Sequence, residues 1–259
     1  MNKFSTRLFF GILAICLPVI LVQAQKNRPV IKPKSAPVQS ATQIVGAKGI
    51  VADEKLSLLR IQPSLFAASV QRMRIGREVV ITGLKEADGV TFYRVNALPN
   101  NTGWVQAEAI VTKVRRGDDE RFARIVQAND GFEQIELAAM FLETFPKSTL
   151  RPPILLLFGD LIEEQARKIS TDATKKLNRR EMAASNAPLH SYYLNYVSLD
   201  RYRKLGITFL FNIATKQFHY DGSAWEEIVK KFPMSSEVEE AKKRLDSLKE
   251  KLESEPVKK

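Results

Sequence analysis

Hydrophobic and polar positions alternate over short distances in the first half of this chain and follow a helical period in the second half. Between residues 44 and 112, short segments rich in β-branched and aromatic residues are separated by Gly, Pro, Asn and Asp. This pattern is typical of β-strands. We expect strands at residues 50–52, 56–59, 78–82, 91–95 and 103–105. Five short strands in so short a stretch favour a small, closed or half-closed barrel.

Turn residues separate these strands. Asp88-Gly89 follows a charged segment and predicts a β-hairpin, because the two-residue turn needs a positive φ. A second turn is expected at residues 99–103, which contain Pro, two Asn and Gly.

The period changes at Gly117. Apolar residues then recur at helical spacing, and acidic residues 118–120 stand where a helix N-terminus favours them. We expect one helix from residue 118, a second that ends at Phe145-Pro146, and a third that opens at Pro152-Pro153. The third helix has a broad apolar stripe, and its charged continuation reaches residue 184.

The C-terminal helix has the clearest pattern. Ser236 and Glu239 form the spacing of a capping box just after Phe232-Pro233. Apolar residues then follow at Val238, Ala241, Leu245, Leu248 and Leu252. This stripe covers barely two heptads, so a packed terminal helix is favoured over a coiled coil.

A short motif occurs twice in the second half. Residues 141–148 (FLETFPKS) and 228–235 (IVKKFPMS) both end a predicted helix with Phe-Pro-x-Ser. Residues 116–253 thereby resemble the tetratricopeptide-like repeats of bacterial envelope proteins. The resemblance implies an all-α helical-repeat domain that docks a partner protein. The two copies are far apart for adjacent repeats, so the array would be irregular.

The strand-rich part also resembles a known family. The residues that carry the resemblance are Leu58 to Ser64 (LLRIQPS), Ile75 to Val80 (IGREVV), Phe92 to Val95 (FYRV) and Gly103 to Val105 (GWV). In this order they are similar to the bacterial SH3-like (SH3b) domain, although Gln62 and Phe92 replace the more common Gly and Trp. The resemblance implies a small SH3-like barrel at residues 44–115 that binds cell-wall peptides or other extracellular ligands.

Four residues are candidates for that ligand site: Arg60, Phe92, Tyr93 and Trp104. Aromatic rings give a large contact area at low entropy cost, and Arg pairs with carboxylates. The alternative is that Phe92 and Trp104 fill the barrel interior, and for each of the two rings we favour the interior.

Residues 1–24 have the pattern of a secretory signal peptide. Two cations are followed by the apolar run of residues 8–22 and by the small-residue end Val22-Gln23-Ala24. We therefore expect export to the periplasm or the extracellular space, with no stable membrane span after cleavage. An uncleaved anchor is the alternative, but the run is short against the roughly 20 residues that cross a bilayer.

A basic linker follows at residues 25–43, with Pro29, Pro33 and Pro37, four cations and no acid. Spaced prolines favour an extended, solvated spacer. The alternative is an arm that touches an anionic surface. Residues 254–259 form a short charged tail.

Composition narrows the function classes. The net charge of +11 arises mainly before residue 116, so the helical part lacks the basic stripe that nucleic-acid binding requires. The single Cys lies in the leader, and the two His are 29 residues apart, so we predict no disulfide and no metal site.

Five of the six tyrosines lie in the last third of the chain. Tyr192, Tyr193 and Tyr196 are candidates for a partner-binding patch, because tyrosine has an apolar body and a polar tip. Packing between helices is the default alternative.

The sequence contains no nucleophile elbow, phosphate-binding loop or dinucleotide fingerprint. We therefore predict no catalytic residues and no cofactor, and expect an exported, non-catalytic binding or scaffold protein. The barrel would bind cell-wall polymer or peptide, and the helices would bind an envelope protein. Two alternatives stay open: a purely structural helical scaffold with an inert barrel, and a wall-polymer hydrolase whose paired carboxylates meet only in space.

Overall fold

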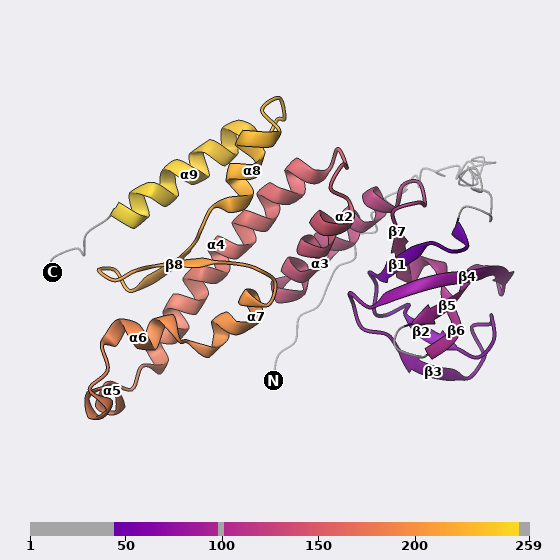
Figure 1. The fold of residues 1–259 in the computed structure, drawn as a ribbon, viewed down its shortest axis with the longest axis horizontal. Coiled ribbons are helices and arrows are strands. Elements are labelled where there is room, and N and C mark those ends of the chain that lie inside the picture. Colours follow the sequence, from indigo (N-terminus) through magenta and orange to yellow (C-terminus); the bar gives the residue numbers. More distant parts are fainter. Residues whose placement is uncertain (1–43, 98–100, 254–259) are drawn as a thin grey trace, which may run out of the picture. The chain divides into compact units, whose positions relative to one another are not determined.

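The computed structural model describes residues 44–97 and 101–253, which form an antiparallel sheet followed by helices and a small hairpin (Figure 1). The predicted leader (1–24), linker (25–43) and charged tail (254–259) lie outside the described residues and stay predictions. Among the described residues, no helix is long and apolar enough to cross a membrane.

Seven strands form the sheet. They are β1 (Lys48–Val51), β2 (Leu58–Arg60), β3 (Ser69–Arg72), β4 (Glu78–Ala87), β5 (Val90–Ala97), β6 (Asn101–Gln106) and β7 (Ile110–Thr112). Their order is β3-β2-β6-β5-β4-β1-β7. No pairing within the described part of the chain joins the edge strands β3 and β7, so the predicted SH3-like barrel is wrong and the sheet is open. The two strands that the sequence pattern missed, β3 and β7, are those edges.

The hairpin between β4 and β5 confirms one turn prediction. Asp88 and Gly89 have φ angles of 52° and 76°, so both residues are left-handed. A two-residue turn of this kind matches the twist of the strands that it joins. The turn therefore fixes the register of the two longest strands.

One face of the sheet buries the apolar interior. Its fully buried members include Leu59, Ile81, Val95, Val105 and Ile110. Alternation along each strand sends the neighbouring side chains to the opposite face. Arg60, Arg94 and Trp104 therefore lie on that outer face.

The helical part follows the sheet. Its helices are α2 (Asp118–Ala128), α3 (Gly131–Thr144), α4 (Arg151–Lys176), α5 (Arg179–Ser185), α6 (Leu189–Leu194), α7 (Asp200–Arg203), α8 (Ser223–Lys231) and α9 (Val238–Glu253). Helix α4 packs against α3 and α8, and α8 packs against α9. The long helix predicted from residue 152 is interrupted at Asn178, whose side chain caps α5.

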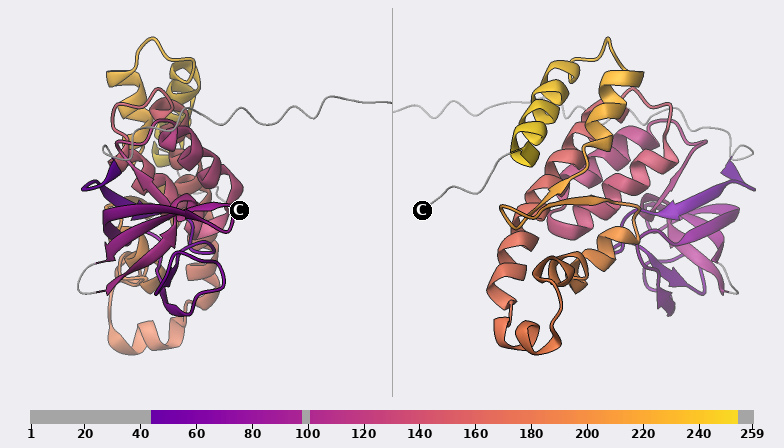
Figure 2. Two further views of the ribbon diagram at one scale, coloured as in Figure 1. Left: turned by 90° about the vertical axis from the view of Figure 1, so that its right-hand side faces the viewer. Right: turned by 60° about the vertical axis from the view of Figure 1, so that its left-hand side comes forward.

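The prediction of an all-α domain is wrong, because a β-hairpin lies within it. Strands β8 (Phe209–Asn212) and β9 (Gln217–Tyr220) pair with each other, and β9 lies along α4 (Figure 2). Two side chains of α4 bind the backbone of β9: Ser170 Oγ accepts from Phe218 N at 2.8 Å, and Glu163 Oε2 accepts from Tyr220 N at 2.8 Å. The two side chains thus accept hydrogen bonds from backbone N–H groups of β9 that would otherwise need a neighbouring strand as acceptor.

The helical-repeat prediction is also wrong, although its motif marks the same local structure twice. The N–H groups of Phe145 and Phe232 each donate to the carbonyl four residues earlier at 2.9 Å, and each residue ends a helix. Between them lie the 26-residue helix α4, the three short α-helices α5, α6 and α7, a 3-10 helix (Val197–Leu199), the β8–β9 hairpin and α8. Each copy of the motif therefore joins two packed helices, α3 with α4 and α8 with α9, but the segments between these pairs differ from them, so the helices do not form a regular repeat array.

Sheet and helices belong to one compact unit. Ala52 and Val111 of the sheet part share an apolar cluster with Phe122, Leu137 and Phe141 of α2 and α3. The change of pattern predicted near residue 116 coincides with the passage from β7 to α2. The two parts thus differ in secondary structure but have a common core between them.

Candidate functional site

Three side chains form a row across the outer face of the sheet. In the strand register, Trp104 of β6 pairs with Arg60 of β2 on one side and with Arg94 of β5 on the other. Side chains that are directly opposite on neighbouring strands lie about 5 Å apart at Cβ and on the same face. Arg94 is exposed, and Arg60 and Trp104 are partly buried. We call these three residues the Arg–Trp–Arg row.

The row depends on a glycine beside it. A Cβ on Gly103 would lie 2.7 Å from the carbonyl oxygen of Arg60 and 2.8 Å from the side chain of Leu59. Strands β2 and β6 approach so closely that only glycine fits on the inner face. Gly103 thereby brings the backbone of Arg60 next to that of Trp104.

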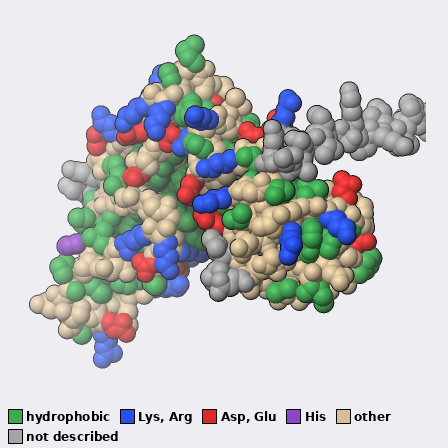
Figure 3. Space-filling view, turned by 45° about the vertical axis from the view of Figure 1, so that its right-hand side comes forward, with side chains coloured by type: hydrophobic (Ala, Val, Ile, Leu, Met, Phe, Trp, Pro, Cys, Tyr) green, Lys and Arg blue, Asp and Glu red, His purple; other side chains and the backbone are tan. Residues whose placement is uncertain are grey.

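Polar side chains continue this face. Asn96 pairs with Thr102 two residues further along β5 and β6, and both are exposed. Thr82 is exposed on the neighbouring strand β4, where its hydroxyl donates to the carbonyl of Arg94 at 3.2 Å. An amide group and two hydroxyl groups therefore lie on neighbouring strand positions of the face that carries the Trp104 ring and the Arg94 guanidinium. Figure 3 shows cationic and hydrophobic side chains next to one another on the surface of the sheet part.

Arg60 has a second contact. Its Nη1 donates to the carbonyl of Ala67 at 2.8 Å and so holds the loop between β2 and β3. The far side of this loop is tied to the β4–β5 turn, because Asp88 accepts hydrogen bonds from Ser64 Oγ and Leu65 N. Between these ties, Phe66 is 89% exposed. The loop thus presents an aromatic ring next to the position that Arg60 anchors.

The other two residues predicted for the ligand site are buried. Phe92 and Tyr93 lie in β5 with almost no exposed surface. The hydroxyl of Tyr93 accepts a hydrogen bond from Arg115 Nη1 at 3.1 Å. Burial raises the pKa of Tyr93, and the nearby charge of Arg115 only partly opposes this. In this structure neither ring presents a surface to a ligand.

The three tyrosines predicted for a partner surface are mostly inside the helical part. Tyr193 and Tyr196 are buried and Tyr192 is partly buried. The ring of Tyr193 stacks on Phe211 of β8 with centroids 4.9 Å apart, and Tyr192 donates to the carbonyl of Ala173 in α4 at 3.1 Å. These contacts fasten α6 and the hairpin to α4.

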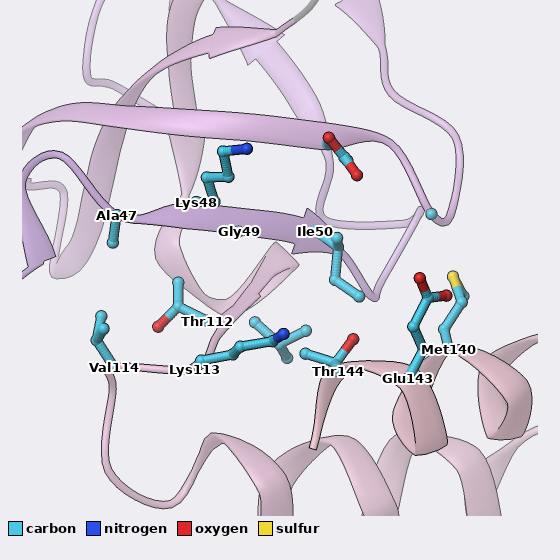
Figure 4. A pocket seen from close by; sticks show the side chains of 13 residues that line it. Ala47, Lys48, Gly49, Ile50, Thr112, Lys113, Val114, Met140, Glu143 and Thr144 are labelled. Atoms are coloured by element: carbon cyan, nitrogen blue, oxygen red, sulfur yellow. The ribbon is translucent and has the colours of Figure 1, made fainter. Parts of the chain in front are cut away.

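A groove runs between the sheet and the end of α3 (Figure 4). Its volume is about 420 Å³. Ile50, Val111 and Met140 provide apolar lining, and Lys48 and Glu143 are among its charged residues. In the close-up, Lys48 belongs to the strand on one side of the opening, and Glu143 and Met140 rise from the helix on the other.

A second hollow of about 610 Å³ adjoins this groove. The two share Lys113, Val114 and Thr144 in their lining, so they lie next to each other, and together we call them the junction groove. The second hollow follows the loop between β7 and α2 and the segment after α3. Besides Lys113, its charged residues are Arg115, Arg116, Asp119 and Lys147.

Sequence reasoning missed Arg94, Asn96 and the junction groove. Arg94 stands inside the Phe-Tyr-Arg-Val motif, and strict alternation from buried Val95 places it on the outer face. That signal was available. The position of Arg94 opposite Trp104 was not predictable, because no local pattern gives the register in which β5 pairs with β6.

No group of three His, Cys, Asp or Glu residues in the described ranges is arranged to hold a metal ion. Comparisons with protein-family models, with curated proteins and with solved structures find no match to this chain. Its function must therefore be inferred from its own residues.

Proposed function

We propose that this chain is an exported, non-catalytic binding protein that holds a carboxylate-bearing cell-wall polymer or peptide on the outer face of its sheet. The observation that carries the proposal is the Arg–Trp–Arg row. A flat aromatic ring offers apolar area to the face of a sugar or to a peptide side chain. A guanidinium beside it offers paired N–H donors to a carboxylate.

The two arginines have different roles in this proposal. Arg60 already donates to Ala67, so it chiefly fixes the loop that borders the face. Arg94 is exposed, and the structure gives its guanidinium no ion pair with another described residue. Arg94 is therefore the carboxylate contact, and Trp104 is the stacking surface. Asn96 and Thr102 would bind hydroxyl or amide groups of the same ligand.

The predicted leader supports the choice of ligand. Export brings a protein to the wall, whose polymer combines sugar rings with peptides that bear carboxylates. An open sheet face suits an extended polymer better than a small metabolite, which proteins usually enclose in a concave pocket.

The experiment is cosedimentation of residues 25–259 with purified peptidoglycan. We expect the unaltered chain to pellet with the polymer, and a variant with both Arg94→Ala and Trp104→Ala to stay largely in solution. Arg74→Ala removes an exposed cation elsewhere in the sheet part and is the matched control. Equal retention of all three proteins would contradict the proposal. Release of soluble fragments from the polymer would contradict its non-catalytic part.

A further inference from the structure

We propose that the junction groove is a second binding site, which takes an extended peptide segment of a partner protein in which apolar residues adjoin acidic residues. This inference is independent of the Arg–Trp–Arg row, which lies on the sheet face of β2, β6 and β5. The junction groove is built from β1, β7, the loop after β7 and the end of α3.

The first half of the junction groove selects apolar side chains. Ile50, Val111, Val114 and Met140 line it together with the small residue Ala47. Its volume of about 420 Å³ lies in the range of ligand sites and accommodates a few side chains of an extended peptide. Its charges balance, since two lysines and two glutamates line it: Lys48, Lys113, Glu78 and Glu143. This half therefore gives apolar contact without a preference for either sign of charge.

The second half is basic. Lys113, Arg116 and Lys147 line it together with Arg115, whose charge is matched by the buried carboxylate of Asp118. Asp119 is the only acid among the described residues that line it, and its carboxylate accepts a hydrogen bond from Ser148 Oγ. A bound segment with carboxylates would complement this surplus of positive charge.

Two of these cations form no ion pair in the described part of the chain. Neither Lys113 nor Lys147 forms an ion pair with any residue in the described ranges, and both are exposed. By contrast, the exposed lysines of α4 that face acids one turn away, Lys168 and Lys176, are both paired. The amino groups of the groove are therefore ready to meet an incoming carboxylate.

Charge also decides between occupants. The chain's own segment 25–43 carries four cations and no acid, so it does not complement the basic half. A segment with both apolar and acidic residues complements both halves at once, the apolar residues at Met140 and the acids at Lys113 and Lys147. A partner with such a segment is the occupant to which the groove is suited.

The test is selection of heptapeptides from a random display library on immobilised residues 25–259. We expect the selected peptides to contain acidic residues next to apolar ones. A labelled selected peptide should bind roughly tenfold more weakly to the variant with Lys113→Glu and Lys147→Glu. Lys249→Glu, an exposed charge reversal on α9, is the matched control and should leave the dissociation constant unchanged.

A further variant separates the two halves of the groove. Met140→Asp places a carboxylate among the apolar lining and should weaken the same peptide while the circular dichroism spectrum stays unchanged. Selection of peptides without acids, failure to select any peptide, or equal affinity for the Lys113→Glu, Lys147→Glu variant would each overturn the proposal. Loss of peptide binding in the Arg94→Ala, Trp104→Ala variant would also overturn it, since it would place the peptide on the sheet face.

Discussion

The carboxylate of Asp118 accepts a hydrogen bond from the backbone N–H of Thr112 at 2.7 Å. Thr112 ends β7, an edge strand of the sheet, and Asp118 begins α2. The carboxylate also pairs with Arg115 at 2.6 Å and with Arg121 at 3.2 Å. Arg115 in turn donates to the carbonyl of Ile110 in β7 at 2.7 Å. One buried acid thereby accepts a hydrogen bond from the edge strand β7 and fixes the start of α2 next to it.

We expect Asp118→Ala to destabilise the whole described fold. Asp118 is only 2% exposed, and its removal leaves a buried N–H without an acceptor and two guanidinium groups without their carboxylate. Loss of one partner of a buried ion pair costs about 3–5 kcal/mol, and the partial exposure of both arginines favours the lower end. Urea unfolding of residues 25–259 measures the change.

Glu120→Ala is the control for this prediction, because it removes an exposed acid from the same helical turn. Its effect should stay within about 0.5 kcal/mol, as for most surface substitutions. Equal effects of the two substitutions would mean that Asp118 does not join the two parts of the fold. We also expect a single unfolding transition, because sheet and helices share the apolar cluster around Phe122.

The sequence correctly predicted those parts of the fold that depend on residues adjacent in the chain. Asp88-Gly89 specifies its turn by φ preference alone, and Phe232-Pro233 ends a helix because proline lacks an N–H. Strand β7 is three buried residues, Ile-Val-Thr, so it has β-branched residues but no alternation of apolar and polar positions, and it is short. The β8–β9 hairpin depends on Glu163 and Ser170, which lie about fifty residues earlier in the chain. No local pattern reveals such partners.

The candidate site was predictable to a smaller extent. The Gly-Trp-Val motif correctly drew attention to Trp104, but the preference for an interior position was wrong, because Gly103 and Val105 are the inward residues and Trp104 is partly exposed. Aromatic content alone could not separate Trp104 from Phe92, which is fully buried. The junction groove arises from packing of α3 against the sheet, which periodicity cannot foresee.

The outer position of Trp104 leads to a stability prediction. We expect Trp104→Ala to lower the free energy of unfolding less than Leu59→Ala does. Leu59 is fully buried on the inner face, and its truncation should cost about 2–5 kcal/mol. Trp104 has a larger side chain but loses only part of its surface from water. Urea unfolding of both variants decides the comparison, and a larger cost for Trp104→Ala would place its ring in the core and remove the stacking surface from the proposed site.

Gly159 lies in the middle of α4, and we expect its replacement by alanine to lower stability, which is the opposite of the usual effect in a helix. Replacement of glycine by alanine inside a helix usually stabilises by roughly 0.5–1 kcal/mol. Here the new Cβ would lie 2.4 Å from Nε1 of Trp225, whose side chain is 1% exposed. We therefore expect Gly159→Ala to destabilise, because overpacking costs about 1–3 kcal/mol. Thermal unfolding measures the effect, and a raised melting temperature would show that the indole ring has room to move.

Glu163 of α4 provides a pH dependence. Its Oε1 accepts from Lys251 Nζ at 2.8 Å and lies 3.1 Å from His219 Nδ1, while its Oε2 accepts from the N–H of Tyr220. Burial alone would raise the pKa of Glu163, but these hydrogen bonds outweigh it and hold the pKa below its ordinary value of 4.5. A carboxylate with a lowered pKa stabilises the fold above its unfolded-state pKa and loses that contribution as pH falls through the folded value.

We therefore expect Glu163→Gln to be less stable than the unaltered chain at neutral pH, and the difference to narrow between about pH 5 and pH 3. Urea unfolding at half-unit pH intervals follows the difference. Glu164→Gln is the control: Glu164 is an exposed neighbour whose pKa is lowered by its hydrogen bond and ion pair with Lys168. Solvent screens that pair, so its removal should change stability little at any pH. The prediction is wrong if the difference in free energy of unfolding between Glu163→Gln and the unaltered chain stays constant from about pH 7 to pH 3. Glu163 would then have the same pKa in the folded and unfolded chains, and α4 would hold β9 and α9 without the charge of Glu163.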